Sequence, residues 1–168
     1  MIRNARPADE HAILEVITAA FTDPTRDASE ERAIVRGTWA ACAPGTRVEL
    51  VAELHGDIVG HLLAAPGRLD GTPVAVAGVA PVCVAPAHQG SGLGRALMEA
   101  LLEEAEGRDW TLLVLLGDPA FYGRFGFEQA GPLGITYAPA GVDSPHFLAR
   151  RVLDWESDLR GSFTYCWE

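Results

Sequence analysis

The amino-acid sequence predicts an α/β fold built on a mixed β-sheet, and two patterns carry this prediction. Residues 46–66 contain alternating apolar and polar positions, a turn at "HGD" and a second apolar stretch, which is the pattern of an antiparallel hairpin. Residues 74–117 contain an apolar strand, an amphipathic helix and another apolar strand in that order. A helix of this kind usually connects parallel neighbours, so the sheet is expected to be mixed.

The N-terminal elements are predicted from helical spacing. A short strand opens the chain, and Asp9 is placed to be the N-cap of the first helix. A second helix is expected over residues 28–43 and ends before Pro44 and Gly45. The first helix would bury the face formed by Ile13, Val16, Ile17 and Ala20.

The second half of the chain is predicted to continue the sheet. Pro81 interrupts the central apolar strand and cannot donate to a strand ladder, so it indicates a bulge or a place where neighbouring strands part. Pro119 then opens a short helix, and a last strand is expected in "HFLARRVL". An aromatic tail covers residues 154–168. No repeat or linker divides the sequence, so residues 1–168 are predicted to form one domain.

Composition and charge exclude several classes of protein. The chain is 48% apolar, but its apolar stretches are too short to span a bilayer, and the N-terminus lacks the features of a signal peptide. A cytoplasmic protein is therefore expected. The net charge of −10 disfavours nucleic acid and anionic membrane as partners and slightly favours cationic substrates. The three cysteines lie far apart and form no CxxC pair. Reduced thiols and no metal site are therefore expected.

Three glycines at alternate positions, Gly90, Gly92 and Gly94, stand where the central helix begins. A helix N-terminus has unpaired N–H groups that bind phosphate, and glycine lets the backbone approach an anion closely. Arg95 and Ala96 follow the last glycine, so the sequence lacks the GK[ST] ending of a P-loop. The GxGxxG dinucleotide fingerprint is absent as well. A nucleotide-binding enzyme is therefore disfavoured.

Two motifs give the sequence a resemblance to a known family. The segment "QGSGLG", residues 89–94, matches the Q/R-x-x-G-x-G/A signature of the GNAT acetyltransferase superfamily. "FYGRFGFEQAG", residues 121–131, lies where that superfamily has its Y-x-x-x-G-F element. The order of elements from Ile2 to about Val152 is similar too. "LLGDPAFYGRFGF" resembles a subgroup of bacterial predicted N-acetyltransferases.

The resemblance implies a fold and a binding site for acetyl-CoA as cosubstrate. The fold would be a central, mostly antiparallel sheet, splayed between its fourth and fifth strands and covered by helices on both faces. The backbone of Val82, Cys83 and Val84 would pair with the pantetheine arm. The pyrophosphate would be held by the loop residues Gln89, Gly90, Ser91, Gly92, Leu93, Gly94 and Arg95.

The resemblance also assigns a catalytic acid. Tyr122 occupies the place of the family tyrosine that protonates the departing CoA thiolate, although a core aromatic is the alternative. Many relatives carry an asparagine ahead of this tyrosine, whereas Gly117 or Asp118 stands there in this sequence. Asp118 is instead a candidate N-cap for the helix that begins at Pro119.

Several other residues have more than one possible interpretation. Arg95 either reaches a phosphate of CoA or faces water. Cys83 is interpreted as a core thiol, because its neighbours are apolar and would not activate it as a nucleophile. The general base is not assigned. The candidates are Glu53, His55, His61 and His88, and each by itself is better explained as structural.

The resemblance favours an N-acetyltransferase that moves an acetyl group from acetyl-CoA to a primary amine by direct attack in a ternary complex. The acceptor would be a small-molecule amine or a peptide amine, and a homodimer is possible. The alternative is a non-catalytic acyl-CoA-binding or regulatory module of the same fold. Relatives often carry a glutamate on the middle strands that acts as a base through water, but "GVAPVCVAP", residues 78–86, contains no acid. That absence and the missing asparagine suggest the alternative.

Overall fold

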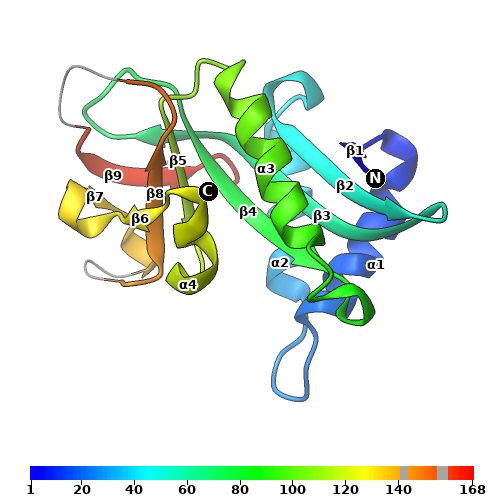
Figure 1. Cartoon of the computed structure of the whole chain (residues 1–168). Helices are drawn as coiled ribbons and strands as arrows, with labels where there is room; N and C mark the ends of the chain where they lie inside the picture. The colour runs from blue at the N-terminus through cyan, green and yellow to red at the C-terminus, as the bar shows by residue number, and fades with distance from the viewer. Residues whose placement is uncertain (141–143, 155–158) are drawn as a thin grey trace. The chain divides into compact units, whose positions relative to one another are not determined.

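A computed structural model describes residues 1–140, 144–154 and 159–168 (Figure 1). Its residues divide into two compact units, which are considered one at a time. Unit 1 comprises residues 1–64, 80–101 and 167, and unit 2 comprises residues 65–79, 102–166 and 168. The boundary between them falls inside two strands and one helix.

Unit 1 contains an antiparallel set of strands. The strands are β1 (Ile2–Asn4), β2 (Val48–Leu54), the first part of β3 (Asp57–Leu69) and the last part of β4 (Val76–Val84). β1 pairs with β2 and β2 pairs with β3, with Ile2 opposite Ala52 and Val48 opposite Ala64. The antiparallel pairing of β2 and β3 confirms the predicted hairpin, and a register shift after Ala52 precedes its turn.

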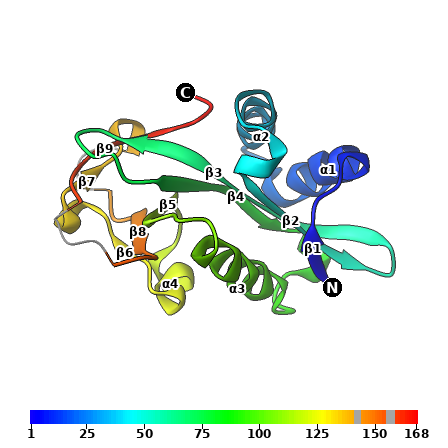
Figure 2. The same ribbon diagram turned by 90° about the horizontal axis from the view of Figure 1, so that it is seen from above.

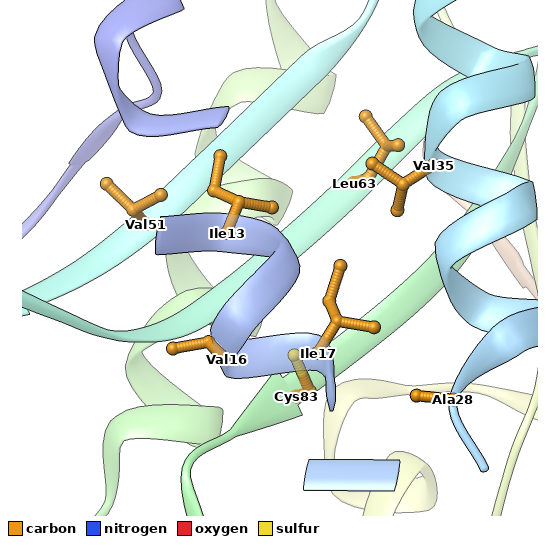
Figure 3. Packing of buried hydrophobic residues seen from close by; sticks show 8 residues of the cluster. All are labelled: Ile13, Val16, Ile17, Ala28, Val35, Val51, Leu63 and Cys83. Atoms are coloured by element: carbon orange, nitrogen blue, oxygen red, sulfur yellow. The ribbon is translucent and has the colours of Figure 1, made fainter. Parts of the chain in front are cut away.

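Helices cover both faces of the strands in unit 1. Figure 2 shows α1 (Glu10–Phe21) and α2 (Ser29–Ala41) on one side of β1 to β4, and α3 (Leu93–Glu106) on the other. A buried cluster joins α1 and α2 to the sheet (Figure 3) and consists of Ile13, Val16, Ile17, Ala28, Val35, Val51, Leu63 and Cys83. Side chains alternate between the faces of a strand, which is why Val51 and not Ala52 belongs to this cluster.

One detail of the first helix differs from the prediction. Asp9 does precede α1, but its carboxylate accepts no hydrogen bond from the helix. It accepts hydrogen bonds from the Arg3 guanidinium at 2.7 Å and from the Arg6 amide at 2.7 Å. A charged donor nearby competes better for the carboxylate than the helix amides do.

Unit 2 contains the parallel pair that the sequence predicts. Val76 to Gly78 in β4 pair in parallel with Leu112 to Val114 in β5 (Leu112–Leu116). β8 (Phe147–Arg151) pairs antiparallel with both β5 and β6 (Glu128–Gln129). The short helix α4 (Pro119–Tyr122) follows β5.

The tail forms a strand, which the sequence analysis did not predict. β9 (Gly161–Tyr165) pairs antiparallel with the end of β3 and parallel with β7 (Ile135–Thr136). Its aromatic rings lie over glycines: a Cβ added at Gly67 would meet Phe163 at 2.4 Å, and one at Gly78 would meet Tyr165 at 2.2 Å. The described part of the tail therefore packs back onto its own sheet.

The sheet order is β1-β2-β3-β4-β5-β8-β6, and β9 pairs with β3 and β7. Pro81 lies inside β4, and the peptide bond that precedes it is cis. Six 3₁₀ turns are described, at Pro7–Asp9, Pro44–Thr46, Pro86–His88, Gly123–Phe125, Gly131–Leu133 and Ala138–Ala140. Within the described residues, no helix combines the length and the apolar character needed to cross a membrane.

Candidate active site

The glycine loop between β4 and α3 depends on backbone conformations that favour glycine. Gly90 has a φ of +74° and Gly92 a φ of +87°, both in the left-handed region. A Cβ added at either glycine would meet nothing within 4 Å. The chain therefore needs glycine here for its φ angles, and the space beside the loop stays open for a ligand. Gly94 differs, because it lies inside α3.

The amides of this loop are available to an anion. In the part of the chain that the structure describes, the backbone N–H groups from Gly90 to Arg95 donate to no protein acceptor. The first paired amide of α3 is that of Ala96, which donates to the Gly92 carbonyl at 3.0 Å. Unpaired amides at the start of a long helix, next to left-handed glycines, form an anion-binding concavity.

Side chains of the loop hold its shape. The Gln89 amide donates from Nε2 to the Val84 carbonyl at 3.1 Å and so ties the loop to the end of β4. The Ser91 hydroxyl donates to the His88 carbonyl. Arg95 is exposed and pairs with Glu99 one turn along α3, with Nε and Oε1 at 2.7 Å. Arg95 thus faces water in this structure, which is one of the two predicted possibilities. Its contact with a phosphate stays a prediction.

β4 presents alternate backbone groups to its two edges. The Ala85 amide donates to the Val59 carbonyl in β3 at 2.8 Å. Because consecutive residues of a strand point their N–H groups to opposite edges, the amide of Val84 points away from β3, and so does that of Val82. Of the three residues predicted to contact the cofactor here, Val82 and Val84 therefore have the outward backbone groups, whereas Cys83 points to β3.

The Cys83 side chain behaves as the core thiol that the sequence indicates. It is buried in the cluster between the sheet and α1 and α2 (Figure 3). Burial raises the pKa of the thiol to about 12, although a hydrogen bond from the backbone of His61 opposes this effect. A thiol of this kind is protonated near neutral pH and is a poor nucleophile.

Tyr122 is positioned by the short helix in which it lies. The Asp118 carboxylate accepts a hydrogen bond from the Ala120 amide at 2.9 Å, so Asp118 is the N-cap of α4, as predicted. The half-buried ring of Tyr122 contacts Phe121 edge-on, with a centroid separation of 4.8 Å. A Cβ at Gly117 would lie 2.2 Å from Tyr122 Cε2. The ring therefore covers Gly117, and only glycine leaves room for it.

Of the four candidate bases, Glu53 and His55 have structural roles, and His88 has a described contact through its backbone. Glu53 Oε2 accepts a hydrogen bond from Arg3 Nε at 2.6 Å. His55 has a φ of +53° and forms the exposed turn of the β2–β3 hairpin. The carbonyl of His88 accepts the hydroxyl of Ser91. None of these arrangements indicates a proton acceptor for a substrate.

The fourth candidate, His61, belongs to a buried polar network in unit 1. His61 Nε2 lies 3.1 Å from Glu49 Oε1, which also accepts a hydrogen bond from Trp39 Nε1 at 2.8 Å. Arg47 Nε donates to Glu49 Oε2 at 3.2 Å. Burial opposes ionisation of Glu49, but the contacts with His61 and Trp39 and the charge of Arg47 outweigh it and lower the pKa of the carboxyl. His61 is completely buried, so this network holds α2 to the sheet.

One further acidic residue, Glu31, is not among the candidates predicted from the sequence. Glu31 is among the few charged residues that are buried, and its side chain lies on the core-facing side of α2. The spacing of Ala28, Glu31, Val35 and Thr38 along the helix was the available signal, because a carboxylate stands where the pattern calls for an apolar residue.

Comparison with known proteins identifies the family of this chain. The family model described as "Acetyltransferase (GNAT) domain" matches residues 1–130. The chain belongs to the GNAT acetyltransferase family. The "uncharacterized N-acetyltransferase YhbS" of Escherichia coli is 32% identical over 111 residues, which are 66% of this chain and 66% of that protein. This confirms the resemblance and the predicted fold.

Two solved GNAT structures resemble the whole chain. YhbS from Escherichia coli, in complex with CoA, superposes with a TM-score of 0.85 at 27% identity and covers 98% of this chain and 88% of its own. A GNAT family acetyltransferase from Brucella melitensis, in complex with acetyl-CoA, has a TM-score of 0.78 at 32% identity and covers 98% of this chain and 94% of its own. One relative thus binds CoA and the other binds acetyl-CoA, the cosubstrate that the resemblance implies for this chain.

Proposed function

We propose that this protein is an N-acetyltransferase that moves an acetyl group from acetyl-CoA to a primary amine by direct attack in a ternary complex. The observation that carries the proposal is the set of unpaired amides from Gly90 to Arg95 beside the left-handed glycines Gly90 and Gly92. A protein with a net charge of −10 needs such local donors to hold a diphosphate. Family membership and the CoA and acetyl-CoA complexes of two relatives support the proposal.

The roles of the binding residues are those that the family resemblance implies, and the directions of the backbone groups of Val82 and Val84 support them. The loop residues from Gln89 to Arg95 hold the pyrophosphate, with Gln89 bracing the loop through Val84. The outward groups of Val82 and Val84 pair with the pantetheine arm as an added strand would. An amide near Val84 donates to the thioester oxygen, which gains negative charge as the amine attacks.

The chemistry needs one proton donor from the protein. Acetyl-CoA supplies an activated acetyl group. The amine nitrogen forms a bond to the acetyl carbon, the carbon–sulfur bond breaks, and the sulfur leaves with the bonding electrons. Tyr122 donates its phenolic proton to that sulfur, because a phenol with a pKa near 10 is protonated at neutral pH. The phenol regains a proton from the amine nitrogen or from water, so the products are an amide and free CoA.

Release of free thiol from acetyl-CoA with a panel of primary amines tests this proposal. We expect turnover by the natural sequence and a loss of about tenfold to a thousandfold in Tyr122→Phe. Phe121→Leu alters the neighbouring ring without removing a hydroxyl and is the matched control. Acetyl-CoA affinity, measured by calorimetry, is expected to be the same in all three proteins.

The outcome also separates the proposal from its alternative. If the protein binds acetyl-CoA tightly but transfers to no amine, it is the acyl-CoA-binding module and not the enzyme. If ATP displaces CoA at comparable affinity, the assignment of the glycine loop itself is wrong.

A further inference from the structure

Glu31 is a buried acid in a position that local structure does not explain. It lies in the first turn of α2, and its side chain is only 9% exposed. Ala28, Val35 and Thr38 share its face of the helix and are buried as well. Burying a carboxylate costs several kcal/mol unless its oxygens find partners.

One of the two carboxylate oxygens has a partner and the other lacks one. Oε1 forms an ion pair with Arg26, whose side chain is 49% exposed. Oε2 is buried and has no hydrogen-bond partner among the described residues. A buried unsatisfied oxygen of this kind is rare in folded proteins and calls for an explanation such as a bound ligand.

The positive end of the helix does not account for this burial. Acidic residues are favourable in the first turn of a helix even when they are exposed. Glu30, the neighbour of Glu31 in the same turn, is exposed. The inward direction of Glu31 therefore needs a separate reason.

The surroundings of Glu31 are suited to a cation. The Arg26 guanidinium contacts the Glu31 carboxylate and also lies 5.4 Å from the centre of the Phe21 ring. A carboxylate beside an aromatic face attracts positively charged groups. The side chain of Arg26, which pairs with Oε1, is half exposed, so it reaches the carboxylate from the solvent side.

The helix face that carries Glu31 also reaches the strand that is proposed to bind acetyl-CoA. Ala28, one turn before Glu31, belongs to the same buried cluster as Cys83 of β4, as Figure 3 shows. Val35, one turn after it, belongs to that cluster together with Leu63 of β3. Glu31 thus lies, along α2, between two residues of the cluster that joins this helix to the sheet.

We propose that the free oxygen of Glu31 binds the ammonium group of the acceptor and removes one proton from it. This inference rests on the proposed transfer to a primary amine. An amine with a pKa near 10.4 is uncharged in only about one molecule in 2,500 at pH 7, so a proton acceptor is needed before attack. The proton passes from the ammonium nitrogen to Oε2, the amine keeps its lone pair for the acetyl carbon, and Glu31 later releases the proton to water. The acceptor class is a cationic primary amine.

The test compares Glu31→Gln with Glu30→Gln, a matched control in the same helix turn. Steady-state rates of thiol release are measured with cationic amines that the natural sequence acetylates. Glu31→Gln is expected to lose tenfold or more in kcat/KM, whereas Glu30→Gln stays within twofold. Glu31→Asp keeps a carboxylate and should recover part of the lost rate. The calorimetric affinity for acetyl-CoA should be unchanged in all variants, which also verifies that each one folds.

A second measurement distinguishes this role from a structural one. Glu31→Gln removes the ion pair of Oε1 with Arg26 as well as the free oxygen, so Arg26→Gln, which removes the same pair and keeps the carboxylate, is the reference for stability. Thermal unfolding of Glu31→Gln is expected at the same temperature as that of Arg26→Gln or above it. A clearly lower unfolding temperature than that of Arg26→Gln would assign Oε2 to the fold and overturn the proposal.

The measurements also distinguish failure of the role of Glu31 from failure of the proposed function. If Glu31→Gln keeps more than a tenth of the original kcat/KM, the role of Glu31 is wrong and the proposed acetyl transfer stands. If the natural sequence binds acetyl-CoA but acetylates no amine, the proposed function fails, and the role of Glu31 falls with it.

Discussion

At the scale of single residues, Gly92 is the position where a side chain should do most harm to cofactor binding. Its φ of +87° costs an L-residue about 1 kcal/mol or more, and an added Cβ would point into the open space beside the loop amides. We expect Gly92→Ala to lose about 1 kcal/mol of unfolding free energy and about tenfold or more in acetyl-CoA affinity.

Calorimetry and chemical denaturation check this prediction together. Gly45→Ala is a suitable control, because an added Cβ there also meets nothing within 4 Å and Gly45 has no left-handed φ. A Gly92→Ala protein that binds acetyl-CoA as well as the control would contradict the role given to the loop.

The three cysteines should differ in reactivity. Cys83 and Cys42 are buried, whereas Cys166 is half-buried. The pKa of Cys83 near 12 leaves almost no thiolate at pH 8. A short pulse of iodoacetamide on the folded protein, read by peptide mass spectrometry, is expected to label Cys166 first and Cys83 hardly at all. Equal labelling of Cys83 in the folded and urea-unfolded protein would show that the thiol is not part of the core.

At the scale of elements, α4 is short and depends on its cap. A helix of four residues has few hydrogen bonds of its own, so the bond from the Ala120 amide to Asp118 matters for its geometry. Asp118→Ala is expected to cost about 1 kcal/mol and to displace Tyr122. The expected signature is a fall in the transfer rate with unchanged acetyl-CoA affinity. Glu103→Ala, an exposed change on α3, is the control and should alter neither quantity.

The elements that follow local rules could be predicted, and those that depend on distant partners could not. The β2–β3 hairpin has period-two alternation and a turn signal, and both were read correctly from residues 46–66. β9 has no such pattern, because the aromatic rings of Phe163 and Tyr165 are accommodated by Gly67 and Gly78 on other strands. A contact with such distant parts of the sequence leaves no mark on the spacing within the tail.

At the scale of the whole molecule, stability should depend on pH through paired carboxylates. The pKa of Glu49 lies below its ordinary value of 4.5 in the folded state, so Glu49 stabilises the fold above that pH. This contribution disappears as the pH falls through the lowered pKa. We expect Glu49→Gln to cost about 2 kcal/mol at pH 7 and to lose less stability than the natural sequence between pH 5 and pH 3.

Urea denaturation at pH 7, 5, 4 and 3 measures this difference. Glu15→Gln changes an exposed carboxylate and keeps the acid dependence of the natural sequence. Parallel stability curves for Glu49→Gln and the natural sequence would show that the network around Glu49 does not stabilise the fold.

The family, the fold class and the glycine loop follow from the order of residues alone, because they depend on short-range patterns. Glycines at alternate positions before an amphipathic helix, and the motif around Tyr122, are visible without coordinates. Folding decided which acids and bases meet which partners. The sequence does not reveal that Glu49 pairs with His61 twelve residues away, or that one oxygen of Glu31 pairs with Arg26 while the other has no hydrogen-bond partner among the described residues. Burial sets the energy of a charge, and burial is a property of the packed chain.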